Sequence, residues 1–153
     1  MAEKYEEQLA RVKRYFERFS KINGGISHTQ ESPNYDDDIY AFFQNCYHLK
    51  DWIKNDTYCK TWNVEEFINS NPELQICADI CNGRKHLKLT KPPRSNEAPK
   101  FAGREIKLNL GQGAVIAIKY TITTNSGEID AFELGQKCIA AWESFIVSKS
   151  PTP

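Results

Sequence analysis

The sequence predicts an α+β protein that is mostly α-helical, with a four-helix core and a β-hairpin inserted before the last helix. Apolar residues recur every three or four positions over four stretches, the spacing of a helix with one buried face. Between residues 106 and 122 the period changes to two, as in a strand with one apolar face. A length of 153 residues with 40% hydrophobic residues fits one globular domain over residues 1–148, with residues 149–153 as a frayed tail.

The first two helices have clear limits in the sequence. One helix is expected over residues 3–22 and should end at Asn-Gly-Gly, residues 23–25, because glycine accepts the left-handed conformation of helix C-termini. The second should start at Asn34 or just after it, where the aspartates 36–38 place negative charge at the positive end of the helix dipole. The aspartate run could instead bind a divalent cation. The core stripe of the second helix is Ile39, Phe42, Cys46, Leu49 and Ile53.

The third helix is expected in two pieces, divided near Asn71. Asn63 with Glu66 three residues later resembles a capping box, and Pro72 fits the first turn of the second piece. The dipeptide Asn-Gly at residues 82–83 is a plausible end for this helix.

The hairpin and the last helix follow a proline-containing loop over residues 91–99. Alternating apolar residues at 106–110 and 116–122 flank a Gly-Gln-Gly turn, which predicts two antiparallel strands. The last helix begins with Asp130 as N-cap and Glu133 at its third position, and Ile129 and Leu134 complete a hydrophobic staple.

The cysteines predict buried, reduced thiols and neither a metal nor another cofactor. They are odd in number and form no Cys-x-x-Cys pair. An alternative is a metal site made by Cys77, Cys81 and His86, although this spacing matches no zinc motif. The five cysteines are Cys46, Cys59, Cys77, Cys81 and Cys138.

Positive charge is concentrated in residues 84–107, which we call the basic segment. It carries eight basic and two acidic residues, a net charge of +6, whereas the rest of the chain has 12 basic and 18 acidic residues, a net charge of −6. This asymmetry predicts an anionic partner such as RNA or a nucleotide. The expected contact residues are Arg84, Lys85, Lys88, Lys91 and Arg94.

Histidines provide the candidate catalytic groups. His48 and Asp51 are three residues apart on one helical face, so a hydrogen bond between them could orient the imidazole for acid–base chemistry, or both could be ordinary solvated residues. If the third helix continues through Gly83, then Asp79, Asn82 and His86 share one stripe beside the positive charge.

Residues 81–86, Cys-Asn-Gly-Arg-Lys-His, at a helix end of a mostly helical chain resemble the motif of the HEPN superfamily. Its members are small helical bundles of prokaryotic toxins, defence systems and ribonucleases, and the motif is arginine, four to six residues and histidine, often with asparagine after the arginine. Asn82 and His86 match, whereas Cys81 stands in the place of the arginine. The resemblance implies metal-independent cleavage or binding of RNA at the cleft of a homodimer.

Three interpretations of the function follow. The first is a cytoplasmic, HEPN-like protein that binds RNA or a nucleotide, with ribonuclease activity in which His86 acts as acid or base, Asn82 assists and Arg84 replaces the missing guanidinium. The second is a non-catalytic dimerisation or protein-interaction module. No membrane partner is expected, because the sequence has no long apolar run. A third possibility is a small-molecule pocket lined by aromatic residues, namely Phe43, Tyr47, Trp52 and Trp142.

Overall fold

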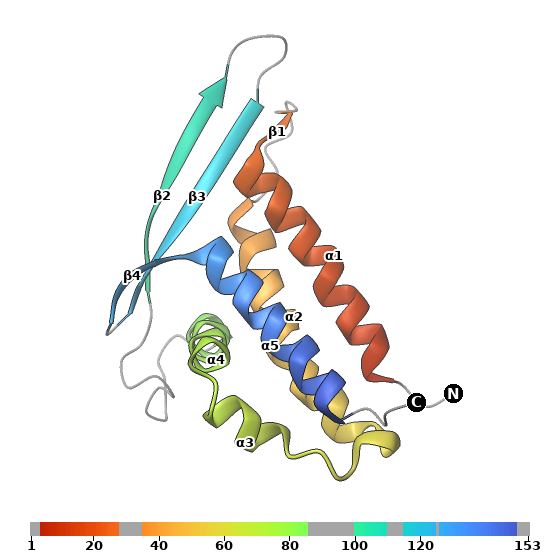
Figure 1. The fold of residues 1–153 in the computed structure, drawn as a ribbon. Coiled ribbons are helices and arrows are strands. Elements are labelled where there is room, and N and C mark those ends of the chain that lie inside the picture. The colour runs from red at the N-terminus through yellow and green to blue at the C-terminus, as the bar shows by residue number, and fades with distance from the viewer. Residues whose placement is uncertain (1–3, 28–34, 86–99, 110–114, 125, 150–153) are drawn as a thin grey trace.

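A computed structural model describes residues 4–27, 35–85, 100–109, 115–124 and 126–149, and it has the expected mostly helical α+β architecture (Figure 1). An antiparallel hairpin precedes the last helix, as predicted. The elements in chain order are α1 (Tyr5–Gly24), β1 (Ile26–Ser27), α2 (Tyr35–Asn55), the 3-10 turn η1 (Thr57–Cys59), α3 (Val64–Asn69), α4 (Pro72–Lys85), β2 (Lys100–Asn109), β3 (Val115–Thr124), β4 (Gly127–Asp130) and α5 (Ala131–Lys149).

Helices α1, α2 and α5 lie side by side, and α3 and α4 complete the helical part (Figure 1). Their shared core is aromatic. The rings of Phe19 and Phe42 meet edge to face with centroids 5.7 Å apart, and Phe16 stacks on Phe132 at 5.3 Å. Such pairs contribute about 0.5–1.5 kcal/mol beyond the burial of their area. The aromatic face of α1 therefore anchors both α2 and α5.

The predicted helix limits are largely confirmed. Gly25 has a φ of 116° and ends α1 by donating its N–H to the carbonyl of Lys21. The third helix is divided as expected, since α3 ends at Asn69 and α4 begins at Pro72. Asn63 caps α3 by accepting the Glu66 N–H at 3.1 Å. Each cap satisfies a backbone group that would otherwise lack a partner at a helix end.

The sheet is larger than the predicted hairpin. Strands β2 and β3 pair with Ile106 opposite Ile118, and the predicted turn at 111–113 lies outside the described residues. Two short strands were missed: β1 pairs with the start of β3, and β4 with its end. Two or four residues are too few to reveal a period of two, so the sequence contained little signal for either strand.

The aromatic residues considered as a pocket are part of the packed core. Phe43 and Trp142 have no exposed surface, and the Trp142 indole donates to the carbonyl of Cys46 at 3.0 Å. Trp52 packs against the same core and lies under the Arg11 guanidinium, 5.5 Å from its carbon. Their helical spacing therefore reflects core packing, which is the commoner role of such a stripe.

None of the helices within the described ranges combines the length and the apolar character needed to cross a lipid bilayer.

Candidate functional site

The last turns of α4 carry the candidate motif. The helix continues through Gly83 to Lys85, so the expected end at residues 82–83 is wrong and the alternative of a continuous helix is correct. Gly83 is exposed, and a helical glycine costs only about 1 kcal/mol relative to alanine. Burial of Leu74, Cys77 and Cys81 on the same helix outweighs this cost. Tertiary packing thus overrides the local stop signal.

The continuous helix places Asp79 and Asn82 one turn apart. Asp79 is buried and Asn82 is half-buried. His86, the third member of the predicted stripe, lies outside the described residues.

His48 of α2 meets this end of α4 through Cys81. Its Nε2 atom lies 3.8 Å from the Cys81 Sγ, within the range of a weak hydrogen bond to sulfur. Cys81 is only 4% exposed and His48 is half-buried. The structure therefore brings His48 into contact with Cys81, which lies 33 residues away in the sequence.

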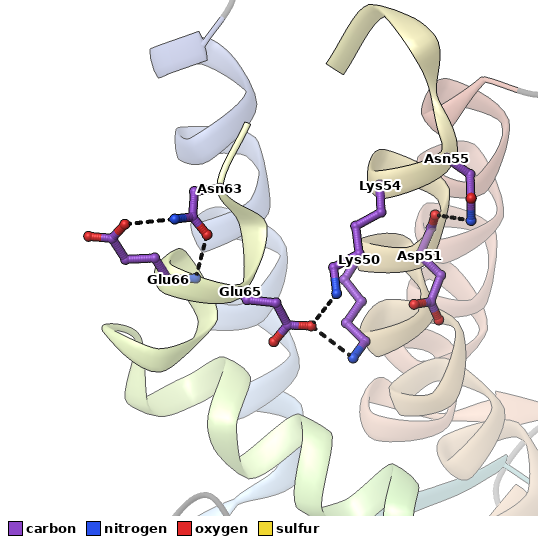
Figure 2. Close-up of polar contacts among 7 residues, drawn as sticks. All are labelled: Lys50, Asp51, Lys54, Asn55, Asn63, Glu65 and Glu66. Atoms are coloured by element: carbon purple, nitrogen blue, oxygen red, sulfur yellow. Dashed lines mark hydrogen bonds and ion pairs between the residues drawn. The ribbon is translucent and has the colours of Figure 1, made fainter. Parts of the chain in front are cut away.

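Of the two alternatives for His48 and Asp51, a hydrogen bond or ordinary solvated side chains, the described structure shows no bond between them. Asp51 is exposed, and its backbone carbonyl accepts the side-chain N–H of Asn55 at 2.8 Å (Figure 2). The imidazole instead contacts the thiol of Cys81. Residues three apart on a helix share a face, but their rotamers are set by the packing of each side chain.

Two lysines on α2, Lys50 and Lys54, share a carboxylate partner on α3. Lys50 and Lys54 both bind one carboxylate oxygen of Glu65 on α3, at 3.2 and 2.6 Å (Figure 2). Burial acts to raise the pKa of Glu65, but the hydrogen bonds and charges of Lys54 and Lys50 outweigh it and lower the pKa to about 2. Lys50 also lies over the Tyr47 ring, 4.5 Å from its centroid. This cluster joins α2 to α3.

The basic segment is attached to described elements at both ends. Arg84 and Lys85 belong to the last turn of α4, and β2 begins at Lys100. Three expected contact residues, Lys88, Lys91 and Arg94, lie outside the described residues.

Three cysteines form a cluster that the sequence did not reveal. The sulfur atoms of Cys46 on α2, Cys77 on α4 and Cys138 on α5 all lie within 4.8 Å of one another. All five cysteines are buried and free, as predicted. The sequence spacing shows that they face the core, but it does not show which of them contact one another. Hydrogen bonds from the Cys138 and Cys77 thiols lower the pKa of Cys46, while burial raises the pKa of Cys77.

Comparison with known families, curated proteins and solved structures finds no match to this chain. The chemistry of the residues themselves is therefore the basis for a functional proposal.

Proposed function

We propose that this protein binds RNA, or a nucleotide, through the basic segment. The observation that carries the proposal is the separation of charge: residues 84–107 have a net charge of +6 in a chain that is otherwise −6. Closely spaced cations gain affinity for a polyanion by displacing its condensed counterions. The first two residues of the segment, Arg84 and Lys85, belong to α4, and its last eight, residues 100–107, belong to β2.

The proposal extends to metal-independent RNA cleavage of the HEPN type. Cleavage of this kind needs a base for the 2′-hydroxyl proton, an acid for the leaving oxygen and a cation for the phosphorane charge. His86 is the first acid–base group. His48 is the second acid–base group, and its contact with Cys81 supports this role because Cys81 is the first residue of the motif, residues 81–86. Arg84 is the cation that this mechanism requires in place of the motif arginine.

Charge reversal tests the binding step. Lys85→Glu combined with Lys88→Glu should weaken binding of a labelled single-stranded RNA by roughly 10-fold or more, because two phosphate contacts become repulsive. The slope of log affinity against log salt should fall by about 1.4, since each single-strand phosphate contact contributes about 0.7. The matched control reverses two exposed lysines outside the segment, Lys60→Glu with Lys137→Glu. Equal losses in both double variants, or no loss in the first, would contradict binding through the basic segment.

Replacement of single histidines tests the cleavage step. The purified protein should cut RNA in the presence of EDTA, and His86→Ala and His48→Ala should each remove this activity. The chain has three histidines, so His28→Ala is a control that removes an imidazole from outside the motif and from outside α2. Cleavage that persists in His86→Ala would point to a contaminating nuclease.

A second candidate function is a non-catalytic interaction module. The observation in its favour is Cys81, which occupies the arginine position of the motif but is a buried thiol in contact with His48. A buried neutral side chain of this kind supplies packing and no positive charge. This function predicts a folded protein that neither cleaves RNA nor responds to the charge reversal, yet has the mass of a dimer by light scattering. A monomer without RNA affinity would exclude a self-association module.

A further inference from the structure

Cys46, Cys77 and Cys138 bring three thiols to one point in the core. They come from α2, α4 and α5, and none of the three has any exposed surface. Their sulfur atoms all lie within 4.8 Å of one another, so a single atom could contact all three. The cluster lies where these three helices meet.

The backbone around the cluster holds the thiols in place. Cys77 donates its S–H to the carbonyl of Phe43 at 3.3 Å, and Cys138 donates to the carbonyl of Glu73 at 3.4 Å. Phe43 belongs to the helix of Cys46, and Glu73 belongs to the helix of Cys77. Each of these bonds therefore links one helix of the cluster to the next and limits the rotation of its thiol.

We infer that the Cys46–Cys77–Cys138 cluster binds one thiophilic monovalent cation, of which Cu(I) is the example tested below. Thiolate sulfur is the ligand that soft ions such as Cu(I) prefer. Metal–sulfur bonds of about 2.3 Å place three sulfurs in a plane about 4 Å apart. The sulfurs, no more than 4.8 Å apart, therefore need to approach one another by less than about 1 Å.

The number of donors selects a three-coordinate ion over zinc. Structural zinc takes four ligands, and no other cysteine, histidine, aspartate or glutamate in the described ranges offers a fourth donor at this point.

Burial determines how the ion enters. The three thiols are inaccessible in the folded chain, so the cation has to bind while the helices assemble or during a large opening of the core. Each thiol that becomes a thiolate releases one proton to solvent, and the binding free energy then adds to the stability of the fold.

Anaerobic refolding with Cu(I) tests the proposal. The wild-type protein, unfolded and refolded with a slight excess of Cu(I) and then treated with a competing chelator, should retain one copper ion per chain. X-ray absorption should show three sulfur ligands, and the midpoint of thermal unfolding should rise. A refolded wild type that retains no copper, or whose copper has nitrogen or oxygen ligands, would overturn the site.

Two cysteine variants supply the matched comparison. Cys138→Ala should retain no copper after the chelator, whereas Cys59→Ala, which removes an equally buried thiol outside the cluster, should retain one. Retention by Cys138→Ala with three sulfur ligands would also overturn the proposal. Should Cys138→Ala fail to refold, the number of sulfur ligands in the wild type and in Cys59→Ala decides the question.

Discussion

The hydroxyl of Tyr120 on β3 donates a hydrogen bond of 2.5 Å to the carboxylate of Asp36 in the first turn of α2. This bond joins the sheet to the helical part of the fold. It also bears on the aspartate run at residues 36–38, which was a candidate cation site. Asp36 binds Tyr120, and Asp38 forms an ion pair with Arg18 at 3.6 Å. Two of the three carboxylates thus serve the packing of α2 against its neighbours.

Removal of this hydroxyl should weaken the fold modestly. Tyr120→Phe is expected to lower the free energy of unfolding by about 1 kcal/mol. The cost is small for a bond to a charged group because Asp36 is exposed and water can replace the lost donor. Tyr58→Phe is the control, since Tyr58 is 70% exposed, and urea unfolding should find it unchanged. Equal midpoints for both variants would show that the bond contributes nothing.

Glu65 should make the stability depend on acid pH. Its pKa is about 2 in the folded protein, below its ordinary value of 4.5, because Lys54 and Lys50 outweigh the effect of burial. A carboxylate with a lowered pKa stabilises the fold above its ordinary pKa, and this contribution is lost as the pH falls through the folded value.

The difference in unfolding free energy between the wild type and Glu65→Gln should therefore be constant above about pH 5 and should shrink toward zero between about pH 4.5 and pH 2. Urea unfolding across this range measures it. The exposed Glu128→Gln variant is the control for the general effect of removing a carboxylate. A difference that stays constant down to pH 2 would mean that the ion pairs of Glu65 do not stabilise the fold.

Two helical glycines should respond to alanine with opposite signs. A Cβ at Gly83 would meet no atom within 4 Å, so Gly83→Ala should stabilise the protein by up to about 1 kcal/mol through helix propensity. A Cβ at Gly135 would lie 2.9 Å from Cε1 of Phe42, a ring with no exposed surface. Gly135→Ala should therefore destabilise by about 1–3 kcal/mol. Thermal unfolding of both variants under one condition tests the contrast, which fails if both midpoints move in the same direction.

Removal of the N-cap of α5 should lower the stability of the fold, and a side chain similar to aspartate should restore it. Asp130 accepts the Glu133 N–H at 3.0 Å, so Asp130→Ala should lower the unfolding free energy by about 1 kcal/mol. Asp130→Asn retains the side-chain oxygen and should recover most of this loss. If the asparagine variant is as unstable as the alanine variant, the negative charge rather than the hydrogen bond is responsible.

Local features of this chain were predictable and features that depend on tertiary contacts were not. The caps at Asn63 and Asp130 involve residues three apart, so the sequence contains the whole interaction. The helix end expected at residues 82–83 was wrong because burial of α4 decides its length. Likewise, the sequence spacing predicts that His48 and Cys81 each belong to a helix. It does not predict that α2 and α4 bring these two side chains into contact.

The position of β3 in the sheet constrains the order in which the chain can fold. β3 pairs with β2 along its length, while β1 and β4 pair with the two ends of β3. During synthesis at roughly 5–20 residues per second, β1 waits on the order of 10 seconds for the residues it pairs with. Trp142, which fills the core beside Cys46, is made later still. Phe16 of α1, whose ring stacks on Phe132 of α5, thus lacks this partner on the ribosome, and a nascent chain should need shielding from aggregation until α5 emerges.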